Sequence, residues 1–462
     1  MRIAVDLHGI QSDGSRSRGI GRYSLEIIKN LIIQHPEHHV ILVVNSALSD
    51  LNQEFQACLN YKNVSYIKWY APSPFDYVSG NNKRNKLACY LKSYTYGCLN
   101  PDLILITSFF EGFSDNCLVD FDYDFIKVPV VSIFYDLIPL INPDSYLRSN
   151  PGFKKFYMSK IKKIKKVDGL LAISNSSAQE ALNYLNIDSS KVYNISSGCD
   201  KKVFNNHSDC GYSNNSTIKH LEFFILYSGA IDPRKNVKTL INAFSKLPPE
   251  LDNYKLVLVG KLLAIEEEFL DQWINLFDID PKSIIRTGYI SDIDLAFLYK
   301  KCSLFVFPSL HEGFGLPVLE AMCSGAAVIG SNCTSITEVI GLDEAMFNPK
   351  NVDEISNLII KALTNEDFNK KLKLNSLAQS KKFSWSISAQ ALIDACHSVI
   401  DQKTINTVPL NFKILFLEKS KYFNLLVKKI KDLGLFKIYN NDYLSAQVAA
   451  SIDKSTIQID SY

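Results

Sequence analysis

The chain has 462 residues, of which 47% are hydrophobic, with 50 Lys and Arg against 48 Asp and Glu. This length favours two or three domains, and the composition is that of a globular protein. The formal net charge of +2 creates no overall field that would attract nucleic acid. Nucleic-acid binding is therefore not predicted.

The cysteines and the apolar runs indicate the redox environment of the chain and whether it is secreted or spans a membrane. The ten cysteines are scattered, with no CxxC pair and no Cys/His grouping at zinc spacing. This predicts neither a disulfide framework nor a structural metal site, and it fits reduced thiols. No run of about 18 apolar residues occurs, and the first residues form a short strand pattern rather than a secretory signal. We expect a cytoplasmic protein.

Short apolar runs recur in two series, and each run is followed by a segment with helical spacing. This alternation is typical of α/β domains with doubly wound parallel sheets. The expected strands are 2–7, 40–45, 103–107, 128–134, 169–174 and 192–196 in the first series, and 223–228, 255–260, 284–287, 304–308 and 326–330 in the second.

A segment at 200–220, rich in Asn, Ser, Lys and Gly, separates the two series, as an exposed linker would. We predict an N-terminal Rossmann-like domain, a linker, a C-terminal Rossmann-like domain, a closing helix and a C-terminal extension, at 1–200, 201–220, 221–385, 386–403 and 404–462. Ligands of such sheets bind beyond the carboxyl ends of the strands, so two facing domains would form an interdomain cleft.

The most informative segment, 308–330, reads PSLHEGFGLPVLEAMCSGAAVIG. It has the pattern of a buried strand, a glycine-rich loop and a short helix. Pro317 is expected to be the first helical residue, and Gly325 a left-handed cap at the far end. The free backbone N–H groups at the start of this helix predict a site for a diphosphate-sized anion.

Two carboxylates, Glu312 and Glu320, flank this predicted anion site. Carboxylates accept hydrogen bonds from sugar and ribose hydroxyls. On loop and charge patterns alone, an ordinary strand, loop and helix with surface glutamates explains the segment equally well.

Two neighbouring cations, Arg234 and Lys235, follow the first expected strand of the second series, in YSGAIDPRKNVKT. Such a pair suits a diphosphate leaving group, because each well-placed donor stabilises developing charge by roughly 3 kcal/mol. Taken alone, these residues fit a solvated turn better, since Lys and Arg are nearly always exposed.

Gly19 and Gly21 lie in RSRGIGRYSLEIIKNL, in a turn that opens an amphipathic helix. The segment is a poor dinucleotide fingerprint, because Ser24 occupies the third glycine position and the second strand ends at Asn45 rather than at an acid. A dehydrogenase is therefore not predicted. The two glycines instead predict a close approach of this backbone to a ligand.

Isolated acidic residues are further candidates for the functional site. Asp136 ends an expected strand in IFYDLIP, where an aspartate is more often a turn or cap residue, and Glu111 in SFFEGF is a weaker candidate. Asp-x-Asp patterns at 120–124 and 292–294 fall in expected loops, where Asp is common, so no metal site is predicted from them.

Together these motifs resemble retaining glycosyltransferases of family 4, which have the GT-B fold. The resemblance extends over roughly residues 2–400 and is carried by the following segments: HEGFGLPVLEAMCSG with Glu312 and Glu320, DPRKN at 232–236, RGIGRY, YDLIP, and FSW at 383–385. The most similar members are mannosyl- and rhamnosyltransferases that build bacterial surface polysaccharides.

The resemblance implies a role for each matched residue. Lys235 and Arg234 would bind the donor diphosphate, Glu320 the ribose and Glu312 the transferred sugar, while Asp136 would contact or polarise the acceptor. Further donor contacts would come from Gly19, Gly21, Tyr289, Ile290, Phe314, Gly315 and Leu316. Ala230 and Tyr135 stand where many members have an arginine and a histidine, so no role is transferred to them.

The implied reaction is a retaining, metal-independent transfer of a hexosyl group, with mannose favoured, and it needs no cofactor. The donor would be a nucleotide sugar, GDP-mannose before UDP- or dTDP-sugars. The acceptor would be a glycan or a polyprenyl-diphosphate-linked glycan in O-antigen, lipopolysaccharide or capsule synthesis. Alternatives are a GT-B phosphorylase or epimerase and a non-catalytic nucleotide-sugar-binding protein. Glu312 and Lys235 are expected to be exposed.

Two basic amphipathic segments, 154–166 and 419–437, suit peripheral contact with an anionic membrane at the inner face of the cell membrane. The alternative is a solvated lysine face with the apolar residues in the core, and this is the preferred interpretation for 154–166.

Overall fold

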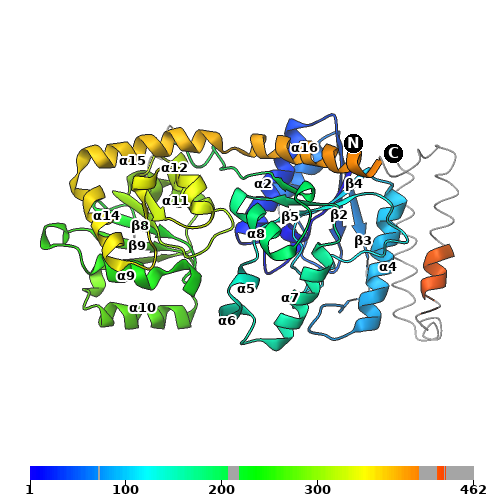
Figure 1. Cartoon of the computed structure of the whole chain (residues 1–462), viewed down its shortest axis with the longest axis horizontal. Helices are drawn as coiled ribbons and strands as arrows, with labels where there is room; N and C mark the ends of the chain where they lie inside the picture. Colours follow the sequence, from blue (N-terminus) through cyan, green and yellow to red (C-terminus); the bar gives the residue numbers. More distant parts are fainter. Residues whose placement is uncertain (52, 71–72, 206–217, 405–423, 431, 433–462) are drawn as a thin grey trace. The chain divides into compact units, whose positions relative to one another are not determined.

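The computed structural model describes residues 1–51, 53–70, 73–205, 218–404, 424–430 and 432 (Figure 1). Residues 206–217 of the predicted linker and most of the predicted extension lie outside this part of the chain. The chain divides into two compact units. The first contains residues 1–173, 178–195 and those from 388 onward, and the second contains 174–177 and 196–387.

The first unit is built on a seven-stranded sheet in the order β3-β2-β1-β4-β5-β6-β7, with every neighbouring pair parallel. Its strands are β1 Arg2–Asp6, β2 His39–Asn45, β3 Val64–Trp69, β4 Leu103–Ile106, β5 Val130–Phe134, β6 Gly169–Ala172 and β7 Val192–Asn194. The six predicted strands are confirmed. Strand β3 was not predicted, because this edge strand is only partly buried and carries no continuous apolar run.

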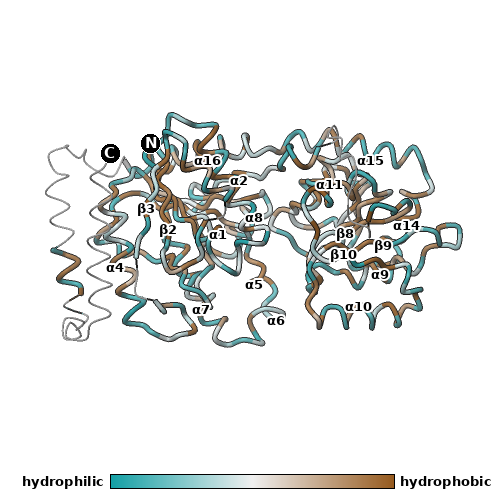
Figure 2. The backbone as a smooth tube through the Cα atoms, turned by 180° about the vertical axis from the view of Figure 1, so that it is seen from behind, coloured by the Kyte–Doolittle hydropathy of each residue, from teal (hydrophilic) through white to brown (hydrophobic). Residues whose placement is uncertain are grey.

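The helices of the first unit connect these parallel strands, as crossover connections require. They are α1 His8–Gln11, α2 Gly19–Gln34, α3 Gln53–Gln56, α4 Asn82–Leu99, α5 Ile138–Ile141, α6 Pro143–Tyr146, α7 Pro151–Ile164 and α8 Asn175–Leu185, with α16 Trp385–Thr404 returning from the second unit. Figure 2 shows the chain around β2 mainly in brown, which marks the apolar core between these helices.

Helix α7 contains the first basic amphipathic segment. Its apolar residues Phe156, Ile161 and Ile164 are buried in the core of the first unit. Lys160 is also buried, with its ammonium 5.1 Å from the centre of the Phe156 ring. The apolar face is thus used for folding, as the preferred interpretation predicted.

The described part of the C-terminal extension, 424–430, is helical. Leu426 and Ile430 belong to the core of the first unit, and the ammonium of Lys429 lies 2.6 Å from carboxylate oxygens of both Asp122 and Asp124. Two apolar residues of the described part of this segment are thus packed inside the protein.

The second unit is built on a six-stranded parallel sheet in the order β10-β9-β8-β11-β12-β13. The strands are β8 Phe224–Ser228, β9 Lys255–Val259, β10 Ile284–Gly288, β11 Leu304–Phe307, β12 Val328–Ser331 and β13 Met346–Phe347. The five predicted strands are confirmed, and the missed β13 has only two residues, too few to produce a pattern.

Helices connect these strands as well: α9 Val237–Phe244, α10 Ala264–Leu276, α11 Asp292–Lys301, α12 Leu316–Cys323 and α13 Ser335–Ile340, followed by α14 Val352–Thr364 and α15 Glu366–Gln379. Because β8 and β11 are neighbours and parallel, the loops that follow them leave the same edge of the sheet. These are the loops with the two strongest motifs.

The nine cysteines among the described residues are free thiols. Within the same residues, no helix has the length and apolar content needed to cross a membrane.

Candidate functional site

The DPRKN segment after β8 forms a tight turn that its own side chains hold. The carboxylate of Asp232 accepts hydrogen bonds from the backbone N–H groups of Arg234 at 3.0 Å and Lys235 at 3.2 Å. Asn236 ends the turn in the left-handed region, with φ 57°, and its side-chain amide donates to the carbonyl of Pro308 at 3.1 Å. Asp and Asn are suited to these positions, so the local sequence explains the turn.

This turn presents both cations to the loop after β11. A terminal guanidinium nitrogen of Arg234 and the ammonium nitrogen of Lys235 each lie 2.7 Å from the same carboxylate oxygen of Glu312. Glu312 is only 8% exposed. Our expectation of an exposed carboxylate is therefore wrong, because the two cations cover it and replace its water.

The charge state of Glu312 follows from this environment. Burial by itself raises the pKa of the carboxyl group, but the positive charges of Lys235 and Arg234 outweigh burial and bring the pKa down to about 2. Glu312 is thus ionised near neutral pH. An ionised carboxylate accepts hydrogen bonds or faces positive charge, and it has no proton to donate.

The helix after the HEGFG loop begins as the glycine pattern predicted, with a shift of one residue. Gly315 adopts φ 99°, in the left-handed region, and α12 starts at Leu316, so Pro317 is its second residue rather than its first. Both positions tolerate proline, because N–H groups in the first turn have no acceptor within the helix. At the other end Gly325 has φ 80°, as predicted for a left-handed cap.

Two serines fix the backbone of the HEGFG loop by hydrogen bonds. Ser174 and Ser177, which belong to the same compact unit as the loop, donate hydroxyl hydrogen bonds to the carbonyl of Gly313 at 2.6 and 2.9 Å. In a trans peptide the carbonyl and the next N–H point in opposite directions. The N–H of Phe314 therefore points away from the two serines.

A second backbone support of Glu312 comes from the start of α13. The backbone N–H of Glu312 donates to the hydroxyl of Thr334 at 3.1 Å, and the hydroxyl of Ser335 donates to the carbonyl of Glu312 at 3.0 Å. Thr334 has φ 51°. A β-branched residue in this region is strained by about 1–3 kcal/mol, and such strain gathers at functional sites. The sequence contained no signal for these serines and this threonine.

The remaining predicted donor residues of this unit differ in exposure. Glu320 is 5% exposed, and the hydroxyl of Tyr299 donates to its carboxylate at 3.3 Å. Phe314 is buried and packs edge-on against Phe383 of the FSW segment, with ring centres 5.6 Å apart. Tyr289 is 82% exposed, whereas its neighbour Ile290 is buried.

Gly19 and Gly21 lie in the first turn of α2, in the first unit. A side chain at Gly21 would meet the carbonyl oxygen of Arg16 at 2.3 Å, whereas nothing lies within 4 Å of a side-chain position at Gly19. Gly21 is thus required by packing, and Gly19 is not. Packing therefore does not explain why position 19 is a glycine.

The two isolated acids of the first unit have structural partners. The carboxylate of Asp136 accepts from the backbone N–H of Ile138 at 3.0 Å, which is the turn role weighed against a catalytic one. Glu111 accepts hydroxyl hydrogen bonds from Ser12 at 2.9 Å and Ser108 at 2.8 Å. Glu111 thereby fixes the loop that leads to α2.

The Asp-x-Asp residues also have local roles. Asp120 lies 2.8 Å from the ammonium of Lys163, and Asp122 and Asp124 pair with Lys429. Asp292 and Asp294 lie in the first turn of α11, where negative charge is favoured. None of these acids belongs to a group of three potential metal ligands among the described residues.

The model of the family "Glycosyl transferases group 1" matches residues 212–379, which include the turn, the loop and α12. Over 402 residues, or 85% of its length, the chain is 38% identical to the serotype-specific mannosyltransferase WbdA of Escherichia coli. Residues 212–379 thus form a glycosyl transferases group 1 domain. The resemblance drawn from the motifs is confirmed.

The match covers 48% of WbdA, and a second WbdA is covered to 45%, so the chain spans about half the length of these curated relatives. It is also 26% identical to the O-antigen chain mannosyltransferase RfbU of Salmonella typhimurium, over 54% of this chain and 69% of RfbU.

Solved structures show the same fold at low sequence identity. HepE of Anabaena, solved with UDP and glucose, aligns with a TM-score of 0.60 over 86% of this chain and 99% of its own, at 16% identity. WaaG, a glycosyltransferase involved in lipopolysaccharide biosynthesis, aligns with a TM-score of 0.58 over 85% of this chain and 99% of its own, at 14% identity. The predicted GT-B fold class, with two Rossmann-like domains, is confirmed.

Proposed function

We propose that this chain transfers a hexosyl group, mannose before other sugars, from a nucleotide sugar to a growing surface glycan of the O-antigen type. The proposal rests on the ion pairs that Arg234 and Lys235 both form with Glu312. Glu312 lies just before the start of α12, where Gly315 adopts a left-handed backbone conformation. Two cations and the positive end of the α12 dipole suit a diphosphate. The curated relatives WbdA and RfbU, both named as mannosyltransferases, support mannose.

In this proposal the diphosphate of the donor takes over the two cations from Glu312. Bond cleavage leaves extra negative charge on the departing nucleoside diphosphate, and Arg234 and Lys235 stabilise that charge more strongly than the charge of the intact donor. The N–H of Phe314, directed by Ser174 and Ser177, contributes a neutral donor. The chain thus supplies charge neutralisation at the leaving group with its own side chains, which supports a metal-independent reaction.

The carboxylate of Glu312 is then free to act on the sugar. As an ionised group it accepts hydrogen bonds from sugar hydroxyls, and it stabilises positive charge that develops at the anomeric carbon. Glu320, one turn into α12, is proposed to bind the ribose. We propose retention of the anomeric configuration, with the departing diphosphate and the incoming hydroxyl on the same face of the sugar.

The proposed donor is GDP-mannose, and UDP- and dTDP-sugars are the alternatives. A thermal-shift panel of the three nucleotides and their sugars identifies the base, and mass spectrometry with a mannose-terminated acceptor tests transfer. Transfer of mannose to the acceptor is the expected result. Product without any acceptor alcohol would indicate a phosphorylase or epimerase, and binding without turnover a nucleotide-sugar-binding protein.

The proposed acceptor is a glycan, free or linked to a polyprenyl diphosphate. Contact with a membrane would then use exposed lysines of α7, because the apolar residues of that helix are in the core. Such binding is electrostatic and weakens with salt. Flotation with anionic and neutral liposomes tests it, and equal failure to bind both would remove the membrane from the proposal.

A further inference from the structure

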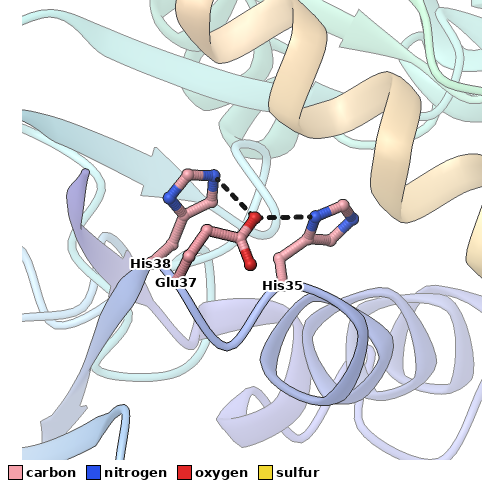
Figure 3. A group of neighbouring side chains, drawn as sticks. All are labelled: His35, Glu37 and His38. Carbon is pink, nitrogen blue, oxygen red and sulfur yellow. Dashed lines mark hydrogen bonds and ion pairs between the residues drawn. The ribbon is translucent and has the colours of Figure 1, made fainter.

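The loop between α2 and β2 contains a cluster of possible metal ligands in the sequence HPEHH. Figure 3 shows a carboxylate oxygen of Glu37 between the imidazole rings of His35 and His38. One ligand atom from each residue lies within 4.8 Å of the other two. The loop precedes β2, so it lies at the amino ends of the strands in the first unit. Ligand loops of the sheet lie at the opposite ends.

The contact of Glu37 with His35 has the geometry of a long hydrogen bond, and both contacts of Glu37 also match the separation of ligand atoms around a metal ion. The carboxylate oxygen of Glu37 is 3.4 Å from Nδ1 of His35 and 3.5 Å from Nε2 of His38. Ordinary N–H···O hydrogen bonds span about 2.7–3.2 Å, so both contacts are long for that interaction. A tetrahedral zinc ion with nitrogen and oxygen ligands about 2.0–2.1 Å away holds its ligand atoms about 3.3–3.4 Å apart.

The surroundings hold the imidazoles in place. His35 and His38 are each 8% exposed, whereas the side chain of Glu37 is 60% exposed. Nε2 of His38 is directed at Glu37, and zinc at Nε2 requires Nδ1 to carry the proton and to donate it to a neutral amino group of Met1, 3.2 Å away. The ring of His397, on α16, packs edge-on against His38 with centres 5.7 Å apart. Two buried imidazoles and one exposed carboxylate allow a metal to enter from solvent.

We propose that His35, Glu37 and His38 bind a zinc ion through Nδ1, a carboxylate oxygen and Nε2, with water as the fourth ligand. Two imidazoles and a carboxylate are a ligand set that suits Zn²⁺. The ion links the end of α2 to the start of β2 and stabilises the first unit. This inference is independent of the proposed transferase activity, because none of the three residues belongs to that machinery.

Isothermal titration of the full chain with ZnCl₂ tests the proposal, after any polyhistidine tag and bound metal have been removed. The expected result is one zinc ion per chain and a higher melting temperature of the zinc-loaded protein. X-ray absorption should show nitrogen and oxygen neighbours around zinc and no sulfur, which excludes binding by the cysteines.

Glu37→Gln is the decisive variant, because this exposed side chain can change without disturbing the core. It should weaken zinc binding at least about tenfold, since an amide is a far poorer zinc ligand than a carboxylate. Glu250→Gln, an exposed glutamate of the second unit, should bind zinc like the wild type. His35→Gln and His38→Gln should abolish stoichiometric binding. Wild-type protein that binds no zinc, or Glu37→Gln with unchanged affinity, would overturn the proposal.

Discussion

The ammonium of Lys235 lies 2.7 Å from a carboxylate oxygen of Glu312, 77 positions further along the chain. Arg234 meets the same oxygen at the same distance. One negative charge therefore holds two positive charges at a place where, in the proposed reaction, a diphosphate brings further negative charge. This arrangement leads to the first two predictions.

Replacing Glu312 by Gln removes the carboxylate that both cations share, and leaves Arg234 with Asp232 at 3.5 Å. We expect the free energy of unfolding to fall by about 3 kcal/mol, because breaking a largely buried ion pair leaves uncompensated charge. Added pyrophosphate should raise the melting temperature of this variant more than that of the wild type, since no carboxylate competes with the anion. Differential scanning fluorimetry measures both effects, and Glu268→Gln, at an exposed position of α10, is the control. An equal response of variant and wild type to pyrophosphate would contradict the model of anion exchange.

Lys235→Ala should lower kcat/KM for the nucleotide sugar at least about 100-fold, because it removes a charge that acts on the leaving group. Its effect on stability should be smaller than that of Glu312→Gln, since Arg234 still neutralises the carboxylate. Lys238→Ala, on the exposed face of α9, serves as the matched control. Initial rates with saturating acceptor test the prediction. Wild-type turnover of Lys235→Ala would remove this residue from the mechanism.

The depressed pKa of Glu312 predicts how stability depends on pH. The pKa is about 2 in the folded protein, against a reference value of 4.5. The stabilisation by its ion pairs is therefore complete above about pH 4.5 and is lost as the pH falls towards about 2. Urea unfolding at pH 6 and pH 3 should show the stability difference between wild type and Glu312→Gln shrinking by about 2 kcal/mol. A difference that is independent of pH would refute the assignment of this charge state.

The serine support of Gly313 predicts an effect on donor binding from residues that do not touch the donor. In Ser177→Ala the carbonyl of Gly313 loses one of two hydroxyl partners, and in the double variant with Ser174→Ala it loses both. The N–H of Phe314 is then less well directed, so we expect a KM for the donor about tenfold higher in the double variant, with a smaller change in kcat. Ser176→Ala, whose side chain lies between the two serines in the sequence, is the control. A loss of kcat with unchanged KM would speak against a positioning role.

The two glycines of α2 should respond differently to the same substitution. Gly21→Ala places a methyl group against the carbonyl of Arg16, so it should destabilise the first unit by about 1–3 kcal/mol. Gly19→Ala meets no atom within 4 Å and should fold normally. If Gly19 is a donor contact, its variant should lose donor affinity without losing stability. Thermal unfolding and donor titration of both variants separate packing from binding.

Much of the fold could be predicted from local patterns. A buried parallel strand and an amphipathic helix each have their own periodicity, so eleven expected strands are found in place, whereas the half-buried β3 and the two-residue β13 are not predictable in this way. The Gly315 turn and the Gly325 cap were predictable because few other residues adopt a left-handed backbone.

The motifs also predicted which residues would lie close together, but not how they pair, how deeply they are buried or how they ionise. Arg234, Lys235 and Glu312 were identified as candidates, and the order β8-β11 explains why their loops meet. Their mutual pairing, the burial of Glu312 and its low pKa result from contacts across 77 positions of sequence.

The sequence by itself determined the α/β class, the turns and the candidate residues, because each depends on interactions between near neighbours. Only the tertiary structure decided that Ser174 and Ser177 support Gly313, that Thr334 is strained against Glu312, and that His35, Glu37 and His38 converge. These features depend on where packing places distant segments and how far it removes water from them, and neither is encoded in a local pattern.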